Sequence, residues 1–280
     1  MFYHQLRNEL WKLFAKKRTY IGFGMFLVAQ LLIILLFRYN SGARAMITRP
    51  LLQMNYSLEQ FYSSLTIAVP VLINIAYLLL PLYVALVGGD LVAKEAEDGT
   101  LRMILSRPIS RFRLLLVKWV AGAIFSVILA LVLGVSGILF CSLFFHSGGL
   151  FVAMPWEHVF SVFESTEGWE RYIEANLFLT VKAISIMGLA FMFSCFNMKP
   201  AAATIVALSV FLISKILQDI PYFADLQPWF LTYHLNVWVD LFRQPIPWFQ
   251  IGESMSLLFG FNVTFFIIGW LAFQVRDIKS

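Results

Sequence analysis

The chain has 280 residues, of which 60% are hydrophobic and only 13% are charged, and its mean hydropathy is +0.79. Soluble domains are roughly 45–50% apolar and about 25% charged, so this composition excludes a soluble fold and indicates an all-α membrane protein. The net charge of +5 does not indicate nucleic-acid binding, because the basic residues flank apolar runs. Cys141 and Cys195 lie in apolar runs and form neither a disulfide framework nor a metal motif.

Residues 1–18 have apolar side chains at helical spacing, among them Tyr3, Leu6 and Leu10, with basic residues largely on the other face. This pattern predicts an amphipathic helix in the inner membrane interface. A plain basic flank that only sets the topology is the alternative. No signal-peptide cleavage site follows the first apolar run, so we expect that run to remain as an anchor.

Six apolar stretches can cross a membrane as helices of about 20 residues, some with their flanks. They are 21–37, 65–87, 119–145, 175–196, 201–217 and 254–275. Most Lys and Arg residues fall in the segments on the side of the N-terminus. The positive-inside rule therefore predicts that both termini are cytoplasmic. We expect one domain over residues 1–280 in the plasma membrane, which is the inner membrane of a bacterium.

Segment 88–118 joins the second and third spans on the predicted cytoplasmic side, and it is longer than most connections in compact bundles. It contains two short helical patterns, 90–97 and 100–106, which the turn signal Asp98-Gly99 separates. A proline soon after the second pattern ends it, because the residue before proline resists the helical conformation.

The second helical pattern has an apolar face, formed by Leu101, Ile104 and Leu105. A short helix that exposes apolar side chains at the cytoplasmic surface is suited to docking a soluble partner. We therefore expect a partner to dock here, and a solvated linker is the alternative.

Two long segments lie on the predicted outer side, 146–174 and 218–250. The second, which we call the outer aromatic segment, contains nine aromatic residues and four prolines. This pattern favours short helices that lie in or re-enter the outer membrane interface. A compact cap on the ends of the spans is the alternative.

The sequence predicts no catalytic residue, no metal site and no cofactor in this chain. No glycine is followed by lysine, so a GxxxxGK[ST] phosphate loop is absent. Residues 134–137 match the GxSG motif of intramembrane serine proteases, but no histidine lies within a predicted span to act as the base. We interpret this motif as small residues that allow close helix packing.

Polar residues inside the spans are the candidates for a translocation path. We single out Lys182, Asn74 and Asn262. Lys182 and Lys215 lie toward the outer ends of their spans, so snorkelling to the interface is the alternative for both. For the asparagines we favour hydrogen bonds between helices.

The sequence KEAEDGTLRMILSRPISR at 94–111 resembles the characteristic cytoplasmic loop of the ABC type-2 permease family. That pattern is E-x-E-x-G-T-L, three or four residues, and S-R-P-I-S-R. Glu95, Glu97 and Gly99 fit it, as do Thr100 and Leu101. The six spans, the basic first helix, the aromatic segment before the last span and the FQVRDI close near the C-terminus are also similar to that family.

The resemblance implies a transmembrane permease subunit of an ATP-binding-cassette exporter, paired with a second permease subunit as a homodimer or with a paralogue. A separate ABC ATPase would bind ATP and Mg²⁺. In that family the loop acts as the coupling helix and the outer aromatic segment forms re-entrant helices. The residues that the resemblance assigns to ATPase coupling are Glu95, Glu97, Asp98, Gly99, Thr100, Leu101, Arg102, Ile104, Leu105 and Arg107.

A self-contained secondary transporter or channel is the alternative function. Such a protein needs polar groups near the middle of the membrane, where these spans are mostly Leu, Ile, Phe and Val. The apolar spans favour an amphipathic or lipid-like substrate over a bare ion, and the sequence does not identify it further.

Overall fold

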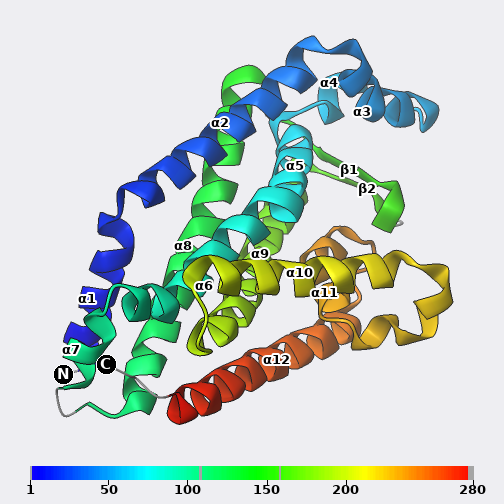
Figure 1. The fold of residues 1–280 in the computed structure, drawn as a ribbon. Helices are drawn as coiled ribbons and strands as arrows, with labels where there is room; N and C mark the ends of the chain where they lie inside the picture. The colour runs from blue at the N-terminus through cyan, green and yellow to red at the C-terminus, as the bar shows by residue number, and fades with distance from the viewer. Residues whose placement is uncertain (1, 107–108, 158, 277–280) are drawn as a thin grey trace.

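The computed structural model describes residues 2–106, 109–157 and 159–276. The chain forms a bundle of long helices, with short helices and a hairpin away from α1 (Phe2–Ala15) and α7 (Thr100–Leu105) (Figure 1). Six helical segments are long and apolar enough to cross a membrane. All six expected spans are therefore confirmed as helices of sufficient length. They are α2 (Lys17–Tyr39), Ser64–Glu97, α8 (Arg111–Phe144), α9 (Ser165–Cys195), α10 (Pro200–Asp219) and α12 (Trp248–Val275).

The second span continues past its expected end at residue 87 as far as Glu97. It consists of α5 (Ser64–Asn74), a π-helical turn η1 (Ile75–Leu79) and α6 (Leu80–Glu97). The expected helix at 90–97 is therefore the end of this span and not a separate piece. The π-turn ends at Leu79, and Leu80 separates it from Pro81, which cannot donate a helical hydrogen bond.

Helix α9 lies at the centre of the bundle and packs against α6, α8, α10 and α12. Gly88 and Gly89 of α6 make this packing close. A Cβ atom on Gly88 would collide with the backbone of Met187 in α9, and one on Gly89 would collide with Thr204 in α10. Small residues let helices approach in the absence of a hydrophobic driving force in lipid.

The GxSG motif also serves helix packing. The Gly134 backbone lies against the side chain of Asn176 in α9, where a Cβ atom would not fit. The Ser136 hydroxyl donates a 2.8 Å hydrogen bond to Gln30 in α2. These contacts support the interpretation of the motif as a site of close approach between helices.

A hairpin and several short helices were not expected, so the all-α description is corrected to mostly helical. The strands pair antiparallel, with Leu150 opposite Phe163, and both are rich in Val and Phe, which favour strands. The unexpected elements are α3 (Ser41–Gln53), α4 (Leu58–Phe61), β1 (Leu150–Met154), η2 (Pro155–Glu157) and β2 (Val159–Phe163).

The outer aromatic segment forms short helices, as the sequence predicts. They are η3 (Pro221–Trp229), α11 (Leu231–His234) and η4 (Val237–Phe242). Trp238 and Phe242 are fully buried, and η4 packs on α9, whereas Tyr222 and Trp229 are strongly exposed. Part of the segment therefore caps the bundle, and part presents aromatic rings to the surroundings. Their depth in a membrane stays a prediction.

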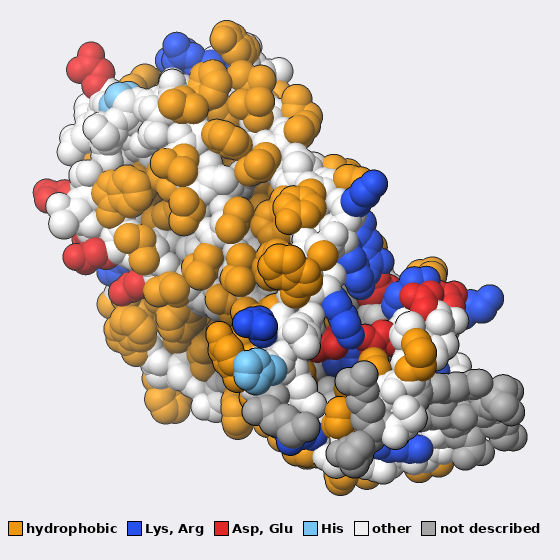
Figure 2. All heavy atoms as spheres, turned by 90° about the vertical axis from the view of Figure 1, so that its left-hand side faces the viewer, with side chains coloured by type: hydrophobic (Ala, Val, Ile, Leu, Met, Phe, Trp, Pro, Cys, Tyr) orange, Lys and Arg blue, Asp and Glu red, His pale blue; other side chains and the backbone are white. Residues whose placement is uncertain are grey.

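Hydrophobic side chains cover most of the middle of the face shown in Figure 2, and charged side chains gather mostly toward its ends. On α2 the exposed apolar residues include Met25, Val28 and Leu32. A soluble monomer rarely exposes so large an apolar surface, so this face fits contact with lipid.

Candidate functional site

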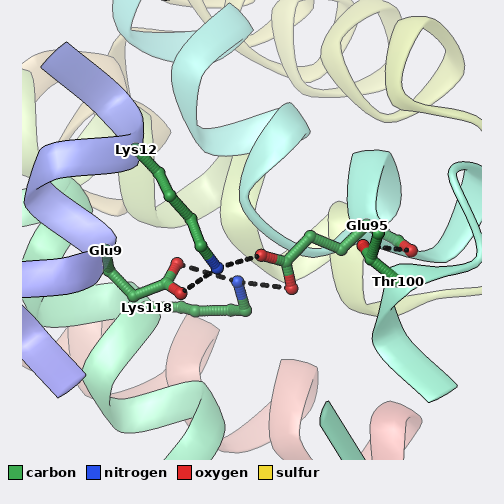
Figure 3. Close-up of polar contacts among 5 residues, drawn as sticks. All are labelled: Glu9, Lys12, Glu95, Thr100 and Lys118. Carbon is green, nitrogen blue, oxygen red and sulfur yellow. Dashed lines mark hydrogen bonds and ion pairs between the residues drawn. The ribbon is translucent and has the colours of Figure 1, made fainter. Parts of the chain in front are cut away.

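Four charged side chains from three helices meet beside the loop that joins α6 to α8 (Figure 3). We call Glu9, Lys12, Glu95 and Lys118 the charge cluster. The Lys12 Nζ atom lies 2.7 Å from Glu9 Oε1 and 3.1 Å from Glu95 Oε1. The Lys118 Nζ atom lies 3.0 Å from Glu9 Oε2 and 2.7 Å from Glu95 Oε2. Each carboxylate therefore contacts both ammonium groups, which links α1, α6 and α8.

The members of the charge cluster differ in burial. The Lys118 side chain is 1% exposed, those of Glu9 and Glu95 are 13% and 16% exposed, and that of Lys12 is 49% exposed. A charge as buried as that of Lys118 is tolerated only when it is paired. Lys118 is therefore the member on which the other contacts depend most.

Burial and pairing have opposite effects on the pKa values of the two α1 residues. Burial raises the pKa of Glu9, but the ammonium groups of Lys118 and Lys12 outweigh it and hold that pKa below its usual value. Burial lowers the pKa of Lys12, but the carboxylates of Glu9 and Glu95 outweigh it and raise that pKa. Both residues are therefore held in their charged forms.

The turn at Asp98-Gly99 ends α6 and starts α7, as the sequence predicts. Gly99 has a φ of +71°, a conformation that glycine adopts without steric cost. The Thr100 hydroxyl donates a 3.2 Å hydrogen bond to the Glu95 carbonyl oxygen. The Glu95 side chain and backbone thus fix both the charge cluster and the turn.

The orientation of α7 differs from the expected docking face. Leu101 is only 1% exposed and packs in the core of this chain, and Ile104 packs against that core. Met103 is 66% exposed instead. Glu97 and Asp98, at the end of α6, are also exposed. The side chains of Arg102 and Leu105, and residue Arg107 as a whole, lie outside what the structure describes.

The end of the loop is joined to the last span. The Arg111 guanidinium donates hydrogen bonds of 3.0 and 2.9 Å to the carbonyl oxygens of Phe273 and Gln274, at the end of α12. The Ser110 hydroxyl accepts a hydrogen bond from the Arg113 backbone N–H and caps α8. The SRPISR part of the motif therefore organises two helix ends.

Sequence reasoning missed the partners of Glu95. Lys12 belongs to the basic residues of the predicted first helix, Lys118 ends the predicted cytoplasmic segment 88–118, and Glu9 carries no predicted role. The spacing of Glu9 and Lys12 places them on one helix face. That signal does not name the loop glutamate as the shared partner.

Residues 5–214 match the family described as ABC-2 family transporter protein. The chain belongs to the ABC-2 transporter family. It is also similar to the uncharacterized protein YhcI of Bacillus subtilis (strain 168), with 25% identity over 210 residues. That alignment covers 71% of this chain and 64% of YhcI. Membership and the six apolar helices indicate a multi-pass membrane protein of this family.

Lys182 of the ABC-2 protein is buried and does not snorkel to the surface. Its side chain is 2% exposed. The Nζ atom donates a 3.3 Å hydrogen bond to Asn236 Oδ1 and lies 4.4 Å from the centre of the Tyr77 ring. Asn236 in turn donates a 3.1 Å hydrogen bond to Glu157. Lys182 therefore belongs to a group of polar side chains, which we call the polar wall, that α9, η1, η2 and the residues between α11 and η4 contribute.

The two candidate asparagines lie in different surroundings. Asn262 donates hydrogen bonds of 2.8 Å to the Ser185 hydroxyl and to the Leu258 carbonyl, so it bonds α12 to α9. Asn74 is exposed and lines a cavity of about 1510 Å³. Among the residues that the structure describes, no group of His, Cys, Asp and Glu is placed to hold a metal ion.

Proposed function

We propose that this ABC-2 protein is the membrane-spanning permease subunit of an ATP-binding-cassette exporter. A separate ABC ATPase, which binds ATP and Mg²⁺, docks on segment 88–118. The observation that supports this most directly is the pairing of the motif residue Glu95 with buried Lys118 of α8 and with α1. A displacement of α7 by the ATPase therefore moves the ends of α1, α6 and α8 together, as a two-state coupling element requires.

The docking surface includes Met103 of α7 and the exposed residues Glu97 and Asp98 at the end of α6. Met103 is an exposed apolar residue of α7, and flexible methionine side chains suit protein interfaces. Leu101 contributes by anchoring α7 to the core of its own chain. A displacement of α7 by the partner is then transmitted to the spans and is not lost in a loosely packed loop.

The proposed assembly contains two permease subunits, either identical or paralogous, in the plasma membrane, which is the inner membrane of a bacterium. Both termini face the cytoplasm. Helix α1 lies in the inner interface, because Tyr3 and Trp11 are exposed aromatic residues on a helix with basic neighbours. The exposed rings of Tyr222 and Trp229 lie at the outer interface.

Co-purification with a candidate ABC ATPase from the same organism tests the docking surface. We expect Met103→Asp to weaken association by tenfold or more, about the effect of losing one interface hot spot. Met46→Asp is the matched control, since Met46 is 73% exposed on α3 at the other side of the proposed membrane. Association that survives Met103→Asp as well as it survives Met46→Asp contradicts this surface.

Cysteine labelling of intact cells tests the topology. Cys141 and Cys195 are buried, so an introduced exposed cysteine dominates the signal. A membrane-impermeant maleimide should label Tyr222→Cys in intact cells and Glu97→Cys only after the cells are opened. The reverse pattern overturns the orientation and, with it, the docking of a cytoplasmic ATPase.

A self-contained transporter is the second candidate, and the polar cavity with buried Lys182 behind its wall favours it. Transport by the purified permease in vesicles without any ATPase distinguishes the two. The exporter proposal requires that such transport be absent until the ATPase and ATP are supplied.

A further inference from the structure

A large cavity of the described chain lies between the second span and the elements that precede the last span. Its volume of about 1510 Å³ exceeds the ~300–1,000 Å³ of ordinary ligand pockets. Residues of α2, η1, α10, η3, α11 and the start of α12 line it, and α11 and the start of α12 lie away from α1 and α7 in Figure 1. It is therefore a chamber separate from the charge cluster.

The lining combines apolar and acidic groups. Ile33, Ile73 and Leu78 are among the apolar residues. Four carboxylates reach the cavity, against the two cationic residues Lys215 and Arg243. Lys182 lies behind the wall and offsets part of the difference, which leaves the chamber negatively charged. The carboxylates belong to Glu157, Asp219, Asp240 and Glu253.

Both cations of the lining are already engaged by their neighbours on the same element. Lys215 pairs with Asp219 at 2.9 Å, and Arg243 pairs with Asp240 at 2.8 Å. These two pairs leave little net charge, so the negative charge of the chamber comes from the two remaining carboxylates.

Glu157 and Glu253 are those carboxylates. Glu157 accepts hydrogen bonds from the neutral donors Tyr77 Oη at 2.8 Å and Asn236 Nδ2 at 3.1 Å. Glu253 is exposed to the cavity and makes no ion pair among the described residues. Hydrogen bonds from neutral donors hold a carboxylate in place but do not cancel its charge.

The pKa of Asp240 agrees with a negatively charged cavity. Burial raises the pKa of the Asp240 carboxyl, the Arg243 guanidinium opposes this, and the Glu157 carboxylate adds to the rise. The pKa lies above its usual value even though a guanidinium is in contact. A bound cation would relieve this repulsion between carboxylates.

We propose that this cavity binds an amphipathic organic cation, with its charge near Glu157 and Glu253 and its apolar body against Ile73 and Leu78. The apolar wall recognises the body by burial, and the carboxylates select the sign of the charge. Only the further step, that the bound cation is the transported substrate, rests on the proposed exporter function. Binding itself needs no ATPase.

Binding of tetraphenylphosphonium to the purified permease in nanodiscs tests the proposal, with empty nanodiscs as the blank. Tetraphenylborate has the same shape and the opposite charge, so it is the matched probe. We expect saturable binding of the cation that the Glu157→Gln/Glu253→Gln variant weakens about tenfold and Glu253→Gln alone about threefold. Glu170→Gln is the control, because Glu170 is exposed on α9 outside the cavity.

Three results overturn the inference: no saturable binding of the cation, equal competition by tetraphenylborate, or the same loss in the Glu170→Gln control. Glu253→Gln keeps the test valid where the double variant does not fold, since the Glu253 side chain makes no hydrogen bond or ion pair within the described part of the chain. Co-purification with the ATPase on the same preparations separates the two ideas. Cation binding without ATPase association contradicts the exporter proposal alone, and the converse contradicts the cation site alone.

Discussion

Replacing Lys118 with methionine tests whether burial decides the strength of the charge cluster. The substitution removes an ammonium group that lies 3.0 Å from Glu9 and 2.7 Å from Glu95 and whose side chain is 1% exposed. Methionine keeps most of the length and apolar volume. Removing one partner of a buried pair costs about 3–5 kcal/mol, because the remaining charges stay buried and less well paired.

Lys12→Met is the matched control, since Lys12 contacts the same two carboxylates at similar distances but is 49% exposed. Exposed pairs contribute about 0–1 kcal/mol. In one detergent, we expect thermal unfolding to show a clear loss of Tm for Lys118→Met, on the order of 2–4 °C per kcal/mol. Lys12→Met should shift Tm by only a few degrees or less.

Equal losses of Tm in the two variants refute the argument from burial. A further variant separates charge from packing. Adding Glu9→Gln and Glu95→Gln to Lys118→Met removes the unpaired carboxylates and should recover part of the lost stability. Absence of any recovery assigns the loss to packing of the Lys118 side chain.

Gly99→Ala should destabilise the loop by about 1–2 kcal/mol, because Gly99 has a positive φ; hydrogen exchange at the end of α6 measures this, and unchanged protection contradicts it. Arg111→Met should speed hydrogen exchange at the end of α12, since it removes two hydrogen bonds to carbonyl oxygens there, each worth about 1.5–3 kcal/mol. The lowered pKa of Glu9 predicts a contribution to stability that is complete above its usual pKa and is lost as pH falls through the lowered pKa. The Tm difference between wild type and Glu9→Gln should therefore be present near pH ~6 and shrink as the pH falls below about 4, and a difference that does not change with pH contradicts the assignment.

Much of the candidate site was predictable because it depends on local chemistry. The break at Asp98-Gly99 follows from a residue type that tolerates positive φ, and the loop motif pointed to Glu95. The partners of Glu95 were not predictable, since Lys12 is 83 residues away in the chain and only helix packing brings it near. The burial of Leu101 in the core of its own chain was not predictable for the same reason, because an apolar helix face does not show which surface it packs against.

The sequence by itself determined the membrane class, the six spans and the loop motif, because apolar length and a local motif are properties of contiguous residues. The tertiary structure decided what those spans do to one another. It buried Lys182 beside Tyr77 and Asn236, used Asn262 to bond α12 to α9, and paired Lys118 with Glu9 and Glu95. Each of these facts depends on distances between helices far apart in the chain, and no local pattern encodes such distances.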